Sequence, residues 1–286
     1  MNFSLFTGRM KMADLVASNY DVILLLSRFG IHLGFGDSSV NEVCRAAGVP
    51  VDLFLMVCNI YSFDGYIPDD EEIESVDVHA LVDYLQASHR HYLNERLPHM
   101  RRHLNNIVSS APATVAHSLN KYFADFQSEV ASHFENEERV LFPELVSIAP
   151  GEQLKLSLRS SYVVPHENMK EKLSDLTQLI YKYLPGDSLT EEMMELVFGV
   201  LQLSKDIEKH ALIEELFLLP RQEYQLSERE KEVLLFVVQG LGSKQIAERL
   251  NISIHTVNSH RKNITQKTGI KSVAALAVYA TMHNLV

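Results

Sequence analysis

Apolar residues recur every three or four positions along most of this chain, and this spacing predicts helices rather than strands. Two such stripes run through residues 119–141 and 196–217. Two more cover residues 81–97 and 162–180. Four amphipathic helices joined by short links predict an antiparallel four-helix bundle, which we place at residues 76–222.

A group of shorter helical patterns precedes the predicted bundle, in residues 1–68. Gly30 is placed to end the first of them, because glycine tolerates the left-handed conformation found after a helix. The three patterns begin near Met12, Ser39 and Val51. The acidic run PDDEE from Pro68 to Glu72 predicts a linker. Residues 1–68 are therefore expected to form a small helical domain.

Capping residues mark three further helices in the C-terminal stretch, residues 225–286. Ser227 followed by Glu230 is a capping box. The predicted N-caps are Ser227, Ser243 and Ser253, and the predicted stops are Gly240 and Gly269. Two helices joined by a turn of three or four residues, the second basic on one side, predict a helix-turn-helix that fits the major groove of DNA. The whole chain is expected to be all-α.

The helix after Ser253 is the predicted DNA-reading helix. Its inward positions are Val257 and Ile264, which leaves polar residues on the outside. Asn can pair with adenine, Lys or Arg can pair with guanine, and Ser, Thr and Lys also reach phosphates. The outward residues are His255, Asn258, Ser259, Arg261 and Lys262. The alternative is a protein-interaction module with a solvated basic face.

Charge divides the chain in the same place. The net charge is −11 over 286 residues, but residues 225–286 hold eight Lys and Arg against four Asp and Glu, which leaves −15 on residues 1–224. The acidic part would repel nucleic acid, whereas the C-terminal stretch would not. Double-stranded DNA is therefore the expected partner of residues 225–286.

Composition also bears on the compartment. No apolar run approaches the roughly 18 residues of a membrane span, and the N-terminus lacks the pattern of a signal peptide. The chain has two cysteines, Cys44 and Cys58, too few for a disulfide framework. We expect a cytoplasmic protein with no membrane partner.

The candidate chemistry lies in a repeated motif, HFENEERVLFP at residues 133–143 and HALIEELFLLP at residues 210–220. Each copy has a Glu four residues after its His, so the two side chains project together from one helix face. Both pairs continue apolar stripes. Because a buried ionised Glu is costly unless it is paired or binds a cation, the motif predicts a metal site. The alternative is a purely structural pair.

The other two bundle helices also place a His on the apolar stripe. His89 lies midway between Leu85 and Leu93, and His166 precedes Met169 and Leu173 by helical steps; His91 is the replacement for His89 if the register is shifted. The candidate metal ligands are His89, His133, Glu137, His166, His210 and Glu214. Six nitrogen and oxygen ligands suit two ions of iron or manganese better than one tetrahedral zinc. His32, His91, His99, His103 and His117 are expected to be surface or packing residues.

On these motifs, residues 76–222 resemble the hemerythrin-like domain of the di-iron iron-sulfur cluster repair proteins. The resemblance implies two non-haem iron ions per chain, held by four His and two bridging Glu. Residues 29–44, FGIHLGFGDSSVNEVC, resemble the short domain that precedes the bundle in those proteins. Its usual Cys-Cys pair is replaced here by Gly34 and Phe35, although Cys44 is kept. Cluster repair is therefore not carried over to this chain.

Residues 225–286 resemble the LuxR-type DNA-binding domain over their full length. The resemblance implies base contacts by Asn258, Ser259 and Lys262. It implies backbone contacts by Lys244, Thr256, Arg261 and Lys267. The last helix, SVAALAVYATMHNL, commonly forms a dimer contact in that family, so a homodimer is expected.

These features predict a transcription regulator, not an enzyme, in which a di-iron bundle senses oxygen, nitric oxide, redox or iron status. The first alternative is a di-iron enzyme that reduces oxygen or nitric oxide, or donates iron for cluster repair, with a DNA-binding domain appended. The second alternative is a bundle that stores iron and reports its availability.

Overall fold

The computed structural model describes residues 5–109, 111–147, 156–183, 190–218 and 226–268, and the single residues 270, 273, 276, 279, 280 and 285. These residues form helices and no strand, apart from one isolated bridge between Lys11 and Ser39. The all-α prediction is confirmed. The chain divides into two compact units, Met1–Pro220 and Arg221–Val286.

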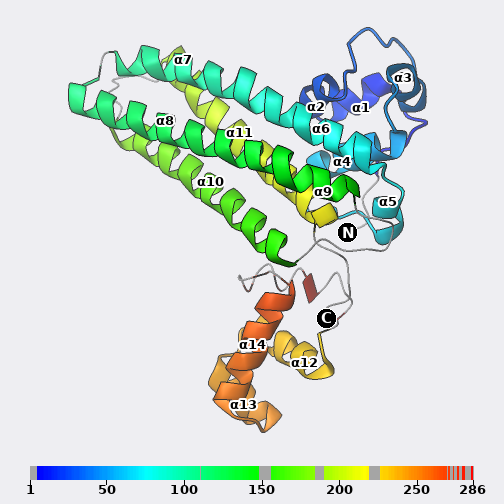
Figure 1. Ribbon diagram of the computed structural model, residues 1–286, viewed down its shortest axis with the longest axis vertical. Helices are drawn as coiled ribbons and strands as arrows, with labels where there is room; N and C mark the ends of the chain where they lie inside the picture. Colours follow the sequence, from blue (N-terminus) through cyan, green and yellow to red (C-terminus); the bar gives the residue numbers. More distant parts are fainter. Residues whose placement is uncertain are drawn as a thin grey trace. The chain divides into compact units, whose positions relative to one another are not determined.

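Four long helical segments form a bundle in the first unit (Figure 1). The first consists of α6 (Val78–His91), the π-helical turn η1 (Tyr92–Arg96) and α7 (Leu97–Val108), and the second of α8 (Ala113–Asn136), the π-helical turn η2 (Glu137–Leu141) and α9 (Phe142–Ser147). The third is α10 (Leu156–Tyr183) and the fourth is α11 (Glu191–Leu218). The packed pairs are α7 with α8, α8 with α10, α10 with α11, and α11 with α7, which closes the bundle.

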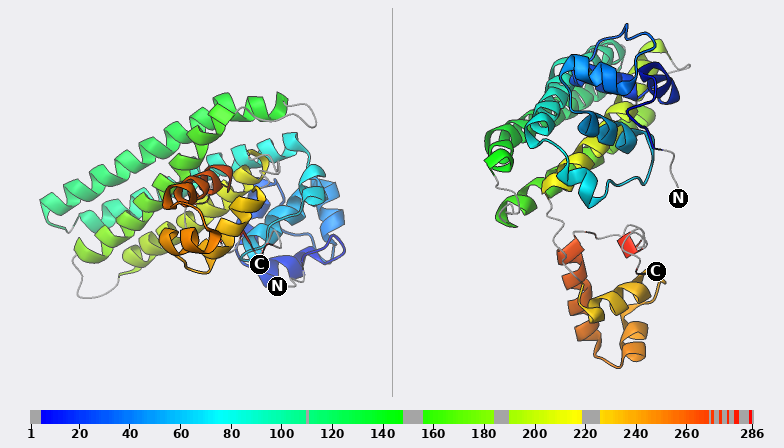
Figure 2. Two further views of the ribbon diagram at one scale, coloured as in Figure 1. Left: turned by 90° about the horizontal axis from the view of Figure 1, so that it is seen from below. Right: turned by 90° about the vertical axis from the view of Figure 1, so that its right-hand side faces the viewer.

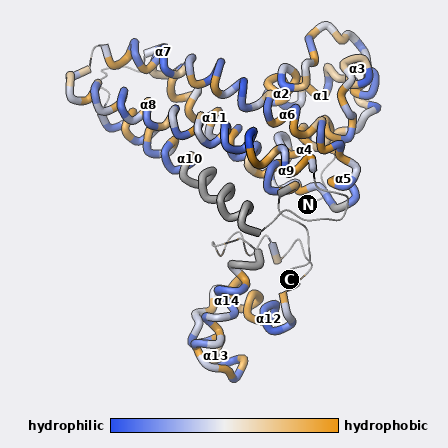
Figure 3. Tube along the Cα trace, viewed as in Figure 1, coloured by the Kyte–Doolittle hydropathy of each residue, from blue (hydrophilic) through white to orange (hydrophobic). Residues whose placement is uncertain are grey.

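The apolar stripes of the sequence line the inside of this bundle. The α8 stripe supplies Phe123, Phe126 and Val130, and the α11 stripe supplies Leu196 and Leu203, all buried. Along the bundle helices, hydrophobic and hydrophilic residues alternate at helical spacing (Figure 3). Burial of these side chains is the main stabilising contribution to the bundle, since helices of this kind gain little from propensity alone.

Five shorter helices precede the bundle and pack at one end of it (Figures 1 and 2). They are α1 (Met12–Ser18), α2 (Val22–Arg28), α3 (Val40–Ala47), α4 (Val51–Ser62) and α5 (Asp70–Glu74). Their core is continuous with that of the bundle, because Phe54 and Val57 belong to one buried cluster with Leu85, Phe142 and Ile213. The N-terminal helices and the bundle are thus a single compact unit, and an independent domain over residues 1–68 stays a prediction.

Two N-terminal segments differ from the sequence-based prediction. The helix expected to run from Met12 to Phe29 is broken between α1 and α2, where the Asn19 side chain accepts a hydrogen bond from the Asp21 amide at 2.9 Å. The linker expected at PDDEE is wrong, since Asp69 caps the short helix α5 in a capping box with Glu72. Local side-chain hydrogen bonds to the backbone decide both outcomes. Gly30 follows α2 with φ +65°, as expected of a helix stop.

Among the described residues, no single helix is long and apolar enough to cross a membrane. Within these described ranges, one pair of helices, α3 and α4, reaches that length and composition when taken together, and the pair is bent by 119°.

The second unit contains α12 (Glu228–Val238), α13 (Ser243–Leu250) and α14 (Ile254–Thr268). The capping box of Ser227 and Glu230 is present, and the Ser253 hydroxyl accepts from the Thr256 amide at 3.0 Å. Ser243 is the first residue of α13 rather than its cap; Gly242 takes the cap position and its amide donates to the Gln245 side chain. Gly240 adopts φ +83° after α12, and Gly269 lies outside the described residues. The arrangement of α13 and α14 is the expected helix-turn-helix.

Candidate metal centre and DNA interface

The candidate metal ligands with described side chains come from three of the four bundle segments. His89 lies in the last turn of α6, His133 near the end of α8, and Glu137 at the start of η2. His210 and Glu214 are one turn apart on α11. Both π-helical turns therefore lie beside candidate ligands, and such turns occur frequently at functional sites because the extra residue re-aims the side chains around it.

Four of these side chains meet in the interior. One ligand atom from each of His89, Glu137, His210 and Glu214 lies within 4.8 Å of the other three. His89 Nε2 is 3.1 Å from His210 Nε2 and 3.4 Å from Glu137 Oε2. His210 Nε2 is 3.1 Å from Glu214 Oε1. Packing of the bundle helices thus brings His89 and His210 together, although they are 121 positions apart in the chain.

The remaining predicted ligands are placed less completely. His133 Nε2 lies 2.8 Å from Glu137 Oε1, within the same His-Glu motif. The backbone of His166 belongs to α10, but its side chain lies outside the described part of the structure. His91, the alternative to His89, has its Nδ1 3.0 Å from Glu95 Oε2 and is not in the group.

Glu138 contacts the site but was not among the residues predicted from the sequence. Its Oε1 lies 3.0 Å from His89 Nδ1, while the His89 ring stacks on Phe134 with centroids 4.0 Å apart. A carboxylate on one ring nitrogen fixes the orientation of a histidine and leaves the other nitrogen for a metal. The sequence does mark this residue, because each copy of the repeated motif has a Glu five residues after its His as well as four residues after it.

Electrostatics at the group favour a bound cation. Glu137 and Glu214 are 0% and 1% exposed. Burial and the neighbouring Glu214 carboxylate raise the pKa of Glu137 well above its usual value. Burial lowers the pKa of His89 to about 4, which favours the neutral imidazole that binds metals. Two buried carboxylates beside imidazole nitrogens are a donor set for iron, manganese or a similar ion, and the residues present therefore fit a metal.

Two stretches of the chain match two known families. Residues 80–221 match the family described as hemerythrin HHE cation binding domain, and residues 224–280 match the luxR family of bacterial regulatory proteins. The chain is a hemerythrin–LuxR fusion. The buried His and Glu group lies inside the hemerythrin HHE domain, and the helix-turn-helix lies inside the LuxR-family domain.

Curated proteins that are similar to part of this chain include the "Oxygen regulatory protein NreC" of Staphylococcus aureus strains JH9, JH1 and Mu3. Each is 43% identical to this chain over 60 residues, which are 21% of this chain and 28% of the relative. The chain thus spans little more than a quarter of the length of these relatives.

The LuxR-family domain presents the predicted DNA-contacting residues mostly on its surface. Val257 and Ile264 are buried in the domain core, as expected of the inward positions of α14. The exposed candidates are Lys244, His255, Thr256, Asn258, Ser259 and Lys262, whereas Arg261 is half-buried and the Lys267 side chain lies outside the described residues. Asn258 and Lys262 are one turn apart, so they share one face of α14. A LuxR-family domain with this helix-turn-helix is a DNA-binding module.

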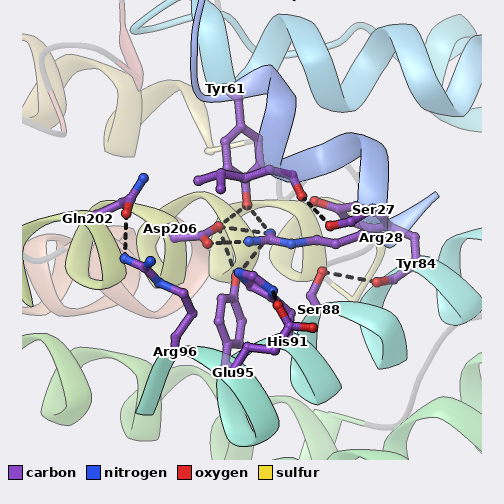
Figure 4. A network of polar contacts seen from close by, with 12 residues as sticks. Ser27, Arg28, Tyr61, Tyr84, Ser88, His91, Glu95, Arg96, Gln202 and Asp206 are labelled. Carbon is purple, nitrogen blue, oxygen red and sulfur yellow. Dashed lines mark hydrogen bonds and ion pairs between the residues drawn. The ribbon is translucent and has the colours of Figure 1, made fainter. Parts of the chain in front are cut away.

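Figure 4 shows a second buried polar cluster. It lies close to the metal-ligand group, because Tyr92 contacts His210. Arg28 of α2 forms a two-pronged ion pair with Asp206 of α11, with Nη1 2.9 Å from Oδ1. The hydroxyls of Tyr61 and Tyr92 donate to the same Asp206 oxygen at 2.5 and 2.9 Å. We call these four residues the Arg28–Asp206 cluster.

The Arg28–Asp206 cluster joins the N-terminal helices to the helix that carries His210 and Glu214. Asp206 lies one turn before His210, and the Tyr92 ring meets the His210 ring edge-on with centroids 5.7 Å apart. Burial alone would raise the pKa of Asp206, but Arg28 and the hydroxyl donors hold it below the usual value. Asp206 is therefore an ionised carboxylate neutralised by the protein itself.

Proposed function

We propose that the protein is a transcription regulator in which the hemerythrin HHE domain senses oxygen, nitric oxide or redox status and controls DNA binding by the LuxR-family domain. The observation that carries the proposal is the buried group of His89, Glu137, His210 and Glu214 in a chain that also holds a DNA-binding module. The buried His and Glu side chains supply donor atoms for a metal. DNA binding by the LuxR-family domain is the activity that a change at this site would control.

The proposed cofactor is a pair of non-haem iron ions, with His133 and His166 completing the ligand set. Bound iron would supply a redox-active centre able to take a small diatomic ligand. The protein's part is to hold the ligands: Glu138 orients His89, and Glu137 and Glu214 lie close enough together to serve both ions. The name of the NreC relatives makes oxygen the first ligand to test.

The proposed coupling runs through α11. This helix carries both His210 and Glu214 and ends at Leu218, nine residues before Ser227 opens the LuxR-family domain. A change in the geometry around Glu214 would shift α11, and such a shift of a packed helix is a recognised kind of switch. The regulator is proposed to act in the cytosol as a homodimer on paired DNA half-sites.

The first experiment measures metal content in anaerobically purified protein. We expect about two irons per chain, as in other carboxylate-bridged bundles, and their loss in His133→Ala and Glu214→Ala. His117→Ala is the matched control, because His117 is exposed on the same helix as His133. The absence of metal, or metal that survives both substitutions, contradicts the iron proposal.

The second experiment measures how tightly oxidised, reduced and nitric-oxide-treated protein bind the same DNA fragment. A difference that disappears in Glu214→Ala supports sensing, and equal binding by all three forms contradicts it. Many turnovers of oxygen or nitric oxide per site, with no effect on DNA binding, would instead identify an enzyme.

The third experiment tests the DNA interface. Asn258→Ala and Lys262→Ala should weaken specific binding by about 1–3 kcal/mol each if they contact bases. Lys231→Ala removes an equal charge from α12, where Lys231 pairs with Glu228 at 2.8 Å, and should have a smaller effect. Unchanged specific binding in both α14 variants would favour the protein-interaction alternative.

A further inference from the structure

A second group of histidine and glutamate side chains lies between α7 and α11. His99 and His103 are four residues apart on α7, so both rings project from one helix face. Glu192 and Glu195 are three residues apart on α11, which packs against α7. One ligand atom from each of His99, His103 and Glu195 lies within 4.8 Å of the other two.

This group is separate from the candidate iron site. His99 follows His89 by ten residues of continuous helix, and His210 follows Glu195 by fifteen. At about 1.5 Å per residue these intervals place the two groups roughly 15–20 Å apart along the bundle. An ion held by this group would therefore be independent of the proposed iron site.

His103 is already oriented as a metal ligand. Its Nδ1 makes a short hydrogen bond with the Glu192 carboxylate, and that carboxylate also accepts from the Asn106 side chain at 3.1 Å. The other ring nitrogen, Nε2, is buried and has no hydrogen-bond partner within the described residues. A carboxylate on one nitrogen and an unused lone pair on the other is the arrangement that second-shell carboxylates give to metal-bound histidines.

His99 and Glu195 supply the remaining ligands. His99 Nε2 is 3.8 Å from Glu195 Oε2, and the His99 and His103 rings have centroids 4.4 Å apart. Arg102 competes with a metal here, because its guanidinium donates to His99 Nδ1 at 2.9 Å and adds a positive charge. Since Arg102 is exposed, it can turn away when an ion binds.

We propose that His99, His103 and Glu195 bind a zinc-class divalent ion, with Glu192 positioning His103. Two histidines and one carboxylate leave the fourth tetrahedral position open to solvent or a ligand. The ion links α7 to α11. The side chains of His99 and Glu195 are 35% and 53% exposed, so the ion exchanges with the solution.

The test is a titration with Zn²⁺ by calorimetry and with Co²⁺ by visible absorption, on full-length wild-type protein and on the Glu214→Ala variant. The expected result is one saturable ion per chain in the Glu214→Ala background that is lost in His103→Ala. Glu195→Gln is the second variant, because Glu195 is exposed and its substitution leaves the core intact. Glu192→Gln should weaken binding by about 10–100-fold, as expected for a residue that acts through the ligand.

Arg102→Gln should tighten binding of the ion, because it removes the guanidinium that competes for His99. A group of side chains with a purely structural role would not show this increase in affinity. His117→Ala is the control and should leave the titration unchanged. The proposal is overturned if no saturable ion is found in the Glu214→Ala background, or if His103→Ala and Glu195→Gln bind it as the parent protein does.

Discussion

The Arg28–Asp206 cluster and the candidate iron site bury charge in opposite ways along α11, where Asp206 lies about two turns before Glu214. Asp206 faces an arginine and two tyrosine hydroxyls, so its negative charge is compensated by groups of the chain. Glu214 instead faces Glu137 and histidines, within 4.8 Å. The pKa of Asp206 is correspondingly lowered and that of Glu137 raised.

This difference separates structural burial of charge from burial that serves a ligand. A compensated ion pair completes the fold and needs nothing from solution. Two neighbouring buried carboxylates oppose folding until a cation joins them, so their presence indicates a binding site. The two clusters should therefore respond differently to mutation and to metal.

The largest expected effect is at Asp206. Asp206→Asn leaves the Arg28 guanidinium, whose side chain is 1% exposed, buried without its counter-charge. Breaking one side of a buried pair costs about 3–5 kcal/mol, and the loss should appear in urea unfolding with or without metal. Glu208→Gln is the matched control on α11, because Glu208 pairs with Lys170 while 61% exposed and should cost at most about 1 kcal/mol. Equal effects of the two substitutions would contradict the comparison.

The second effect is a partial recovery of stability when both members of the Arg28–Asp206 pair are replaced. The double variant Arg28→Met with Asp206→Leu removes both charges, and replacing a buried pair by apolar residues is often neutral or stabilising. It should therefore regain about 2 kcal/mol or more of what Asp206→Asn loses. A double variant as unstable as Asp206→Asn would show that the cluster acts through shape and hydrogen bonds rather than through charge.

The third effect should change sign with metal. In metal-free protein, Glu137→Gln removes one of two adjacent buried carboxylates and should stabilise the fold by about 1 kcal/mol. In iron-loaded protein the same substitution should destabilise it, since metal bound to the folded state adds stability that the variant loses. Urea unfolding of both forms measures this, and a loss of stability in the metal-free form would place Glu137 with Asp206 as a structural carboxylate.

The sequence predicts those parts of this comparison that depend on local periodicity. Helical spacing places Glu137 and Glu214 on apolar stripes, and both are buried in the structure. The same spacing places His89 on the apolar stripe of its own helix, although its partner Glu138 and the two π-helical turns were not anticipated. Their position depends on packing between segments, which a single stripe does not specify.

Contacts between residues far apart in the chain could not be predicted from the sequence for the same reason. Arg28 and Asp206 are 178 positions apart, and nothing local to either one marks the other. His99 and His103 were expected to be surface or packing residues. Their spacing was visible, but the carboxylates that they face lie on another helix, and the register between the two helices decides which of them meet.

The smallest expected effects are at Tyr61 and Tyr92. They test whether the Arg28–Asp206 cluster is independent of the candidate iron site, although Tyr92 contacts His210. Tyr92→Phe and Tyr61→Phe each remove one hydroxyl from Asp206, which keeps its other donors, so each should cost about 1 kcal/mol. The Tyr92 ring also contacts His210, but phenylalanine preserves the ring. Both variants should therefore bind the same amount of iron, with unchanged absorption. Loss of iron in Tyr92→Phe alone would mean that the hydroxyl helps to position His210, and that the compensated cluster is part of the metal site.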